Sequence, residues 1–190
     1  MDFRFGDSKK VLANRRKFFV KLSINPNLIA EITQVHGNKV LAVNRTTNPQ
    51  AKADGLITNK KNLFLMLKIA DCMPIGFYDP EHLAIGLIHA GYKGLEKGII
   101  KKTINEIKQN FETNPKDLIV KFSPSIGPCH YKLDIWKEAE NQLISCGILK
   151  ENIDNPKICT YESSDHFSHR RSEDSDQKEG RFVTILGIKM

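Results

Sequence analysis

The sequence predicts an α/β or α+β fold built around a mixed sheet, and three observations favour this class. The chain has 190 residues, a length that suits one domain able to bury a core without structural disulfides or metals. Short runs rich in Ile, Leu and Phe, bounded by Asn, Asp, Pro and Gly, indicate strands, whereas longer stretches show the apolar spacing of helices. These elements are interspersed without a strict βαβ rhythm, which favours a mixed sheet over a parallel one.

The first half of the chain is predicted to contain one helix followed by strands. The predicted elements are a helix at 8–19, strands at 28–35, 39–43, 56–57, 63–70, 75–78 and 83–89, and a loop at 44–52. Asp7 or Ser8 can cap the helix. Gly37-Asn38 resembles a hairpin turn between the first two strands. The later runs are short and separated by turn residues, which favours strands over helices.

The second half is predicted to alternate helices and strands. The predicted elements are a helix after Gly94 that ends before Asn114-Pro115, a strand at 118–122, a helix that Asp134 caps and that ends near Cys146, a strand at 158–161, a loop at 162–180 and a strand at 182–188. The first of these helices carries an apolar stripe at helical spacing, formed by Leu95, Ile99, Thr103, Ile104, Ile107 and Phe111.

Composition narrows the class of protein. Hydrophobic residues make up 40% of the chain and charged residues 27%, which is typical of a soluble globular protein. No apolar run is long enough to span a bilayer, and the start of the chain, MDFRFGDSKK, lacks the apolar region of a secretory signal, so we expect a cytoplasmic protein without a membrane partner. The four cysteines form no C-x-x-C pair, which is typical of free thiols or metal ligands in a reducing compartment.

The net charge of +7 suggests a polyanionic partner. However, Lys97, Lys101 and Lys108 lie away from the apolar stripe of the same predicted helix, as on a solvated helix face. Only Tyr131 and Trp136 place aromatic rings near basic residues, and no known nucleic-acid motif is present. We therefore expect no nucleic-acid partner.

Three reactive side chains stand at the ends of predicted strands. His36, Cys72 and His89 are each followed by a turn or a proline-bearing segment, so three strand ends could bring them to one point. Two imidazoles and a thiolate are good zinc ligands, and three protein ligands leave a fourth tetrahedral position open, as in catalytic zinc sites. For each residue alone, a packed or surface position is the simpler interpretation. Spacing alone therefore leaves metal binding as one hypothesis.

Six ordered motifs along nearly the whole chain strengthen that hypothesis. They are Gln34-Val35-His36-Gly37, Ala53-Asp54-Gly55, Ala70-Asp71-Cys72-Met73-Pro74, His89-Ala90-Gly91-Tyr92-Lys93-Gly94, Gly127-Pro128-Cys129 and Phe167-Ser168-His169-Arg170-Arg171. Together they resemble the YfiH-like laccase-domain family, whose members are also called polyphenol oxidases or peptidoglycan editing factors. The resemblance runs from about Gly6-Asp7 to the C-terminus, which makes it more specific than any one motif.

This resemblance implies a fold, an activity and a metal site. The implied fold is a single domain over residues 1–190, layered α/β/β/α with mixed sheets, similar to that of the cytotoxic-factor-like and YfiH-like cysteine hydrolases. The implied activity is phosphorolysis of adenosine, inosine and methylthioadenosine, with adenosine deamination as a second activity, so purine nucleosides and phosphate are the expected partners. The implied metal ligands and catalytic residues are His36, Cys72 and His89, with zinc as the cofactor and copper as its alternative.

Two departures from the family pattern concern the expected pocket. The glycine- and serine-containing segment that usually precedes Gly6-Asp7 is absent, so we expect a domain shortened at the N-terminus. Tyr92-Lys93 replaces the usual Trp-Arg, which keeps an aromatic ring and a charge but loses the bidentate guanidinium.

Several cations are candidate substrate ligands. Lys93 lies where a strand joins a helix, and together with free amides there it could bind phosphate. Arg15, Arg170 and Arg171 are candidates for binding substrate anions. A solvated surface position is the alternative for each of these cations. Asp71 either orients a metal ligand or caps a turn.

Two other classes of function stay open. A metal-free cysteine hydrolase would use Cys72 as nucleophile and His89 as base to cut an amide in a cell-wall precursor. A non-enzymatic basic module would bind polyanions through its positive charge. The sequence contains no H-x-E with P-C-x-x-C, no G-x-S-x-G and no H-E-x-x-H, so the signatures of other deaminases and hydrolases are missing.

Overall fold

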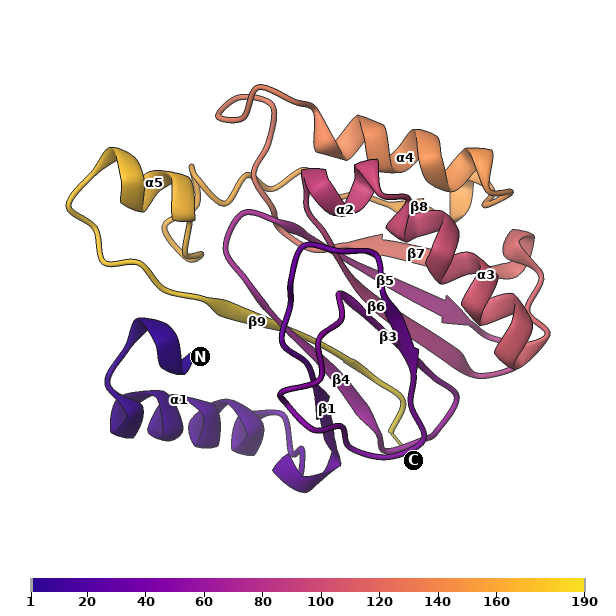
Figure 1. The fold of residues 1–190 in the computed structure, drawn as a ribbon, viewed down its shortest axis with the longest axis horizontal. Helices are drawn as coiled ribbons and strands as arrows, with labels where there is room; N and C mark the ends of the chain where they lie inside the picture. Colours follow the sequence, from indigo (N-terminus) through magenta and orange to yellow (C-terminus); the bar gives the residue numbers. More distant parts are fainter. Residues whose placement is uncertain (1, 190) are drawn as a thin grey trace.

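Two sheets packed face to face, with helices on both outer sides, form the computed structural model, which describes residues 2–189 (Figure 1). The helices are α1 (Ser8–Lys21), α2 (Tyr92–Glu96), α3 (Ile99–Phe111), α4 (Ile135–Ser145) and α5 (His169–Asp174). The strands are β1 (Ile29–Glu31), β2 (Val40–Ala42), β3 (Gly55–Thr58), β4 (Phe64–Ile69), β5 (Met73–Asp79), β6 (Ala84–Ala90), β7 (Ile119–Phe122), β8 (Ile153–Asp154) and β9 (Phe182–Gly187). None of these helices, within the described residues, is both long and apolar enough to cross a membrane.

The two sheets are both mixed. The larger has six strands in the order β2-β3-β6-β5-β7-β8, and the smaller has three in the order β1-β4-β9. Strands β5 and β6 form an antiparallel hairpin in which Pro74 lies opposite His89. Because β5 begins one residue after Cys72, that cysteine and His89 lie at the same end of the hairpin.

Alternating side chains divide the core into layers. On β4, Phe64 and Met66 pack toward α1, whereas Leu65 and Leu67 pack toward the larger sheet, as the period of two in a strand requires. A second core lies between the larger sheet and helices α2, α3 and α4. The order of layers is therefore helix, sheet, sheet, helix (Figure 1). This confirms the predicted mixed α/β class and its α/β/β/α layering.

The predicted hairpin between the first two strands is wrong. Strand β1 is shorter than the predicted strand and pairs in parallel with β4 in the smaller sheet, whereas β2 pairs in parallel with β3 in the larger one. The chain around Gly37-Asn38 therefore crosses from one sheet to the other. The physical reason is that the backbone N–H groups of this crossover donate to the Asp54 carboxylate, so they are not available to a strand partner.

The predicted helix after Gly94 is divided in two. Gly98 lies between α2 and α3 with φ 73°, in the left-handed region that favours glycine and interrupts a helix. The apolar stripe itself is confirmed, since Ile99, Ile104 and Ile107 are all buried. As a consequence, Tyr92 belongs to a separate helix of five residues.

The C-terminal third differs from the prediction in one strand and one loop. Residues 158–161 form no strand, and within the described residues Cys159 makes only an isolated bridge with Ser125. The predicted loop at 162–180 contains α5, whose first turn the Ser168 hydroxyl caps. Asp134 caps α4 as predicted, and β9 confirms the last predicted strand.

Candidate metal centre

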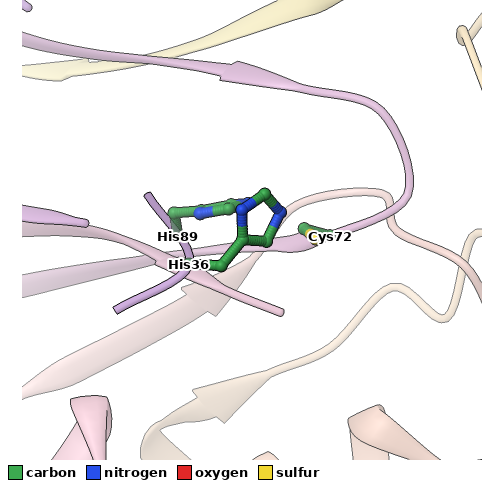
Figure 2. A group of neighbouring side chains, drawn as sticks. All are labelled: His36, Cys72 and His89. Carbon is green, nitrogen blue, oxygen red and sulfur yellow. The ribbon is translucent and has the colours of Figure 1, made fainter. Parts of the chain in front are cut away.

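Three side chains from separate segments meet at one end of the β5–β6 hairpin. His36 lies in the crossover after β1, Cys72 in the bend before β5, and His89 on β6; Figure 2 shows the three pointing toward one another. Each offers one ligand atom, and these atoms all lie within 4.8 Å of one another. The two imidazole rings meet edge to face, with centroids 4.8 Å apart. The structure therefore brings together the three predicted metal ligands.

A buried carboxylate, that of Asp54, supports both histidines. Its Oδ1 lies 2.9 Å from Nδ1 of His89 and accepts the backbone N–H of His36, also at 2.9 Å. The Asp54 side chain is fully buried, at 0% exposure. Because Nδ1 of His89 donates to this carboxylate, Nε2 is left with the lone pair that can bind a metal. Histidine ligands of metals are commonly supported by a carboxylate in this way.

The backbone at His36 lies in an unusual conformation. Its φ is 57°, in the left-handed region, which few residues other than glycine adopt. The N–H groups of Val35, His36 and Gly37 all donate to Asp54, and these bonds stabilise the conformation. Such strain is held at functional sites more often than elsewhere.

Asp71 fixes the bend that carries Cys72. It too has a positive φ, of 77°. Its carboxylate accepts the Thr160 hydroxyl at 2.6 Å and the Arg170 backbone N–H at 2.7 Å, and its carbonyl accepts the N–H of Ile126 at 2.8 Å. Asp71 thus joins the bend to two loops that are distant in the sequence.

Gly91 leaves room for the sulfur of Cys72. A Cβ at this position would lie 2.6 Å from Sγ of Cys72 and 3.8 Å from Cδ2 of His36. The φ of Gly91 is −79°, which any residue can adopt, so the backbone does not require glycine here. The requirement is for space beside the sulfur.

Cys72 and His89 shift the pKa of one another. Burial disfavours the thiolate, but the charge of His89 and hydrogen bonds from His36 and His89 outweigh burial and lower the pKa of Cys72 to about 6. Burial likewise opposes protonation of His89, yet the Cys72 thiolate and Asp54 raise the pKa of His89 to about 9. The protein alone therefore holds a thiolate and an imidazolium side by side at neutral pH.

The donor set suits a zinc or copper ion. A thiolate and two imidazoles are the ligand types that these metals prefer. A cation at this point would replace the proton of His89 while the Cys72 thiolate is already formed, so its charge matches the site. His36, Cys72 and His89 are the residues that would hold it.

The three ligands line a cavity of about 370 Å³. Sites for small molecules commonly have volumes of about 300–1,000 Å³. The other charged or aromatic side chains of its wall are Arg4, Lys68, Asp71, Tyr92, Tyr131, His169, Arg170, Glu173 and Arg181. A larger hollow of about 960 Å³ lies beside α1, but its wall is mostly apolar and contains none of the three ligands. The smaller cavity is therefore the candidate site.

The predicted substrate ligands lie in three different places. Arg170 lines the cavity with a 44% exposed side chain, and its Nη1 lies 3.5 Å from Glu173. Arg15 does not line it: its guanidinium pairs with Glu31 of β1, at the hollow beside α1. Lys93 is exposed on α2 and is not part of the cavity wall. The roles of Arg15 and Lys93 in substrate binding remain predictions.

Arg171 supports the chain rather than the cavity. Its Nη1 donates to the carbonyls of Thr160, Tyr161 and Ser163 at 2.8, 2.7 and 3.0 Å. These bonds fold the loop before α5 around the guanidinium. Its guanidinium is therefore occupied by carbonyls of the protein itself.

Two features of the site were not predicted from the sequence. The role of Asp54 was missed, although Ala53-Asp54-Gly55 is one of the ordered motifs and an acidic residue directly before a buried strand is a usable signal. Tyr131 was considered only as an aromatic near basic residues, yet it lines the cavity. No local pattern connects Tyr131 to strand ends so distant in the sequence.

Replacement of Asp54 should damage both the fold and the metal site. Asp54→Asn puts an amide NH₂ among the donors of Val35, His36, Gly37 and His89. We expect the free energy of unfolding to fall by about 2–4 kcal/mol, because four donors, including the buried Nδ1 of His89, lose a charged acceptor. Zinc affinity should fall by about ten- to a hundredfold. Urea unfolding and competition with a chromophoric chelator measure the two effects.

Asp79→Asn is the matched control. Asp79 is equally buried, at 0% exposure, and its Oδ2 lies 2.8 Å from Nδ1 of His82 at the opposite end of β5. This variant should lose a similar amount of stability and keep its zinc affinity. An equal loss of zinc from both variants would contradict the positioning role of Asp54.

Replacement of Gly91 should damage the metal site alone. Gly91→Ala forces Sγ of Cys72 to move, so zinc affinity should fall by about tenfold or more while the circular dichroism spectrum stays unchanged. Gly76→Ala on the same hairpin is the control, because its Cβ would approach no atom closer than 3.4 Å. Unchanged zinc binding in Gly91→Ala would mean that the Cys72 sulfur is not a ligand.

The chain matches a known family along almost all its length. The family model described as multi-copper polyphenol oxidoreductase laccase matches residues 1–134 and 130–189. A protein of Bacillus subtilis (strain 168), named purine nucleoside phosphorylase YlmD, is 31% identical over an alignment of 195 positions that covers 82% of this chain and 69% of that protein.

Two solved structures share the fold. The crystal structure of YlmD from Geobacillus stearothermophilus aligns with a TM-score of 0.93 at 26% identity and covers 100% of this chain and 84% of that one. The structure of the Bacillus licheniformis hypothetical protein YfiH aligns with a TM-score of 0.91 at 27% identity and covers 99% of this chain and 85% of that one. The chain therefore belongs to the family of the multi-copper polyphenol oxidoreductase laccase model, which confirms the resemblance to the YfiH-like laccase-domain proteins.

Proposed function

We propose that this protein is a zinc-dependent purine nucleoside phosphorylase that acts on adenosine, inosine and methylthioadenosine, with adenosine deamination as a second activity. The observation that carries the proposal is the convergence of His36, Cys72 and His89 in one cavity whose wall also contains cations and tyrosines. A relative named purine nucleoside phosphorylase YlmD supports it. The cavity wall offers aromatic surface for the base, which is the leaving group, and cations for the phosphate that attacks.

The tyrosines suit a purine base. Tyr92 and Tyr131 line the cavity together with Ile126 and Ile135, so the wall combines aromatic and apolar surface. Stacking of a nucleobase on an aromatic side chain contributes about 1–3 kcal/mol. This surface favours a nucleoside over a simple sugar phosphate.

The cations suit phosphate. Within residues 2–189, the ion pair of the Arg170 side chain is the 3.5 Å contact with Glu173, so its guanidinium can turn to make two parallel bonds to an anion. Lys68 is fixed by Glu31 at 2.9 Å and adds positive potential at the same wall. In phosphorolysis a phosphate oxygen forms a bond to C1′ of the ribose while the bond from C1′ to the base nitrogen breaks. The cations would orient the phosphate for this attack.

The leaving base must be stabilised as it departs. A zinc ion, when bound, supplies Lewis acidity for this purpose. Among the chain's own groups, His169 lines the cavity, lies 3.0 Å from Glu179 and can donate a proton to the base. Cys72 would supply the thiolate charge that balances the ion, and Asp54 keeps the imidazole of His89 in the correct orientation.

Product analysis tests the proposal. Purified protein incubated with adenosine should release adenine only when phosphate is present, and any inosine measures deamination. Chromatography separates these products. His36→Ala should lose the zinc ion of this cavity and reduce turnover by about a hundredfold or more. His82→Ala, at the far end of the hairpin, is the matched histidine control and should keep both properties. If the zinc-loaded protein releases no base from any of the three nucleosides, the proposal is wrong.

A metal-free cysteine hydrolase is the second candidate function. The observation that favours it is the Cys72 thiol, whose pKa is lowered to about 6 beside His89, as in a nucleophile activated by a base. In that case Cys72 would attack an amide carbonyl and His89 would give a proton to the leaving amine.

Zinc analysis combined with alkylation separates the two functions. If the site holds zinc, His36→Ala and Cys72→Ala should each lose the same ion, and iodoacetamide should modify Cys72 only after chelation. In the chelated protein the rate should rise with pH up to about 7 and then level off, because thiolate formation is complete above a pKa of about 6. Cys146, whose pKa burial raises, provides a slow internal reference. Rapid alkylation of Cys72 in a protein purified without zinc would instead support the hydrolase.

A further inference from the structure

A second group of sulfur and nitrogen ligands lies outside the cavity wall. Cys129, His130 and Cys159 each offer one ligand atom, and these atoms lie within 4.8 Å of one another. Nδ1 of His130 lies 4.0 Å from Sγ of Cys159 and 3.7 Å from Oε1 of Glu162. Two sulfurs and one imidazole nitrogen therefore face one point, and the Glu162 carboxylate lies beside the imidazole.

Contacts within the fold position these donors. Cys129 and His130 lie in the turn that leads to α4, and Cys159 comes from the segment between β8 and α5. The N–H of Gly127 donates to Sγ of Cys159 at 3.3 Å. The ring of Tyr161 stacks on that of His130, with centroids 3.9 Å apart and planes inclined by 14°. The sulfur and the imidazole are thus held in place by groups that are not ligands themselves.

We propose that Cys129, His130, Cys159 and Glu162 form a second zinc site with a structural role. Four protein ligands of the types Cys, His and carboxylate make a closed tetrahedral set, unlike the three-ligand centre in the cavity. Zinc bonds of about 2.0–2.3 Å place neighbouring donors about 3.3–3.8 Å apart. The 3.7 Å separation between His130 and Glu162 already lies in that range, and the 4.0 Å separation between His130 and Cys159 lies just above it. The ligand atoms of Cys129, His130 and Cys159 all lie within 4.8 Å of one another, so side-chain adjustments of about 1 Å bring them to a zinc ion.

The competing use of this cluster is a disulfide between Cys129 and Cys159. Both cysteines are free thiols in the structure. A disulfide would need neither the imidazole of His130 nor the carboxylate of Glu162, whereas a zinc ion uses all four groups. The presence of nitrogen and oxygen donors beside the sulfurs therefore favours the metal.

A cation here would join the two loops that support the first centre. The loop of Cys129 also contains Ile126, and the segment of Cys159 also contains Thr160; both of these residues are hydrogen-bonded to Asp71, next to Cys72. The proposed site would therefore stabilise the cavity wall without touching a substrate. This role does not depend on which reaction the cavity performs.

Zinc stoichiometry tests the proposal. Protein loaded with zinc, desalted and analysed by plasma mass spectrometry should contain about two zinc ions per chain, and Cys129→Ser and His130→Gln should each contain about one. Cys129 is exposed and His130 is only partly buried, so neither substitution creates a cavity in the hydrophobic core. Cys146→Ser, which changes a cysteine outside both groups, is the matched control and should keep about two.

A second measurement, of the melting temperature with and without a chelator, does not depend on the number of zinc ions per chain. Cys72→Ala removes a ligand of the first centre, so a chelator that still lowers its melting temperature acts on the second site. The double variant Cys72→Ala/Cys129→Ser should lose this response.

The proposal is overturned if Cys129→Ser has the same zinc content as the wild type. It is overturned equally if the protein purified without reductant and loaded with zinc carries a disulfide between Cys129 and Cys159. A protein with both zinc ions but no nucleoside turnover would contradict the proposed function and leave this site supported.

Discussion

The Asp54 carboxylate is the interaction on which the site depends most. It accepts three consecutive backbone N–H groups of the crossover that contains His36 and also holds the ring of His89. The backbone carbonyl of Asp54 also accepts the N–H of His89 at 2.7 Å, so Asp54 holds His89 through both its side chain and its backbone. Because Asp54 itself and the Nδ1 donor of His89 are buried, a neutral or shorter side chain would leave buried polar atoms poorly paired. The same atoms therefore satisfy the fold and orient two of the three candidate ligands.

The site lies where the two sheets meet at one end. His36 comes from the crossover between the sheets, whereas Cys72 and His89 come from the central hairpin of the larger sheet. Along β6, Leu87 faces the smaller sheet and Ile88 faces the helices, so His89 follows the alternation toward the space between the sheets. The ligands therefore rest on rigid strands and a well-bonded crossover, as a site that must hold a fixed geometry requires.

Strand ends could be predicted from the sequence, but strand partners could not. The apolar runs located β3 to β6 and β9, and so placed Cys72 and His89 at strand ends. The position of β1 in the smaller sheet depends on its pairing with β4, which is not encoded in the local pattern of either strand.

Long-range side-chain contacts were also beyond local patterns. Arg15 was predicted as a candidate for binding substrate anions. Its guanidinium instead pairs with Glu31, and Arg15 does not line the cavity. The roles of Asp54 and Tyr131 likewise depend on residues far along the chain. The division of one predicted helix at Gly98 follows from a single positive φ. An isolated glycine in a helical pattern is not enough to predict such a break from the sequence.

Asp71 links three segments of the cavity wall through hydrogen bonds. Its carbonyl and both carboxylate oxygens each hold a different segment: the loop of Ile126, the hydroxyl of Thr160 and the first turn of α5 at Arg170. A segment cannot move away without leaving a buried oxygen of Asp71 unpaired, so each of these bonds opposes opening of its segment. The segments of Ile126 and Arg170, 44 positions apart, are thus linked through one residue, and the cavity is walled by connected segments rather than by independent loops.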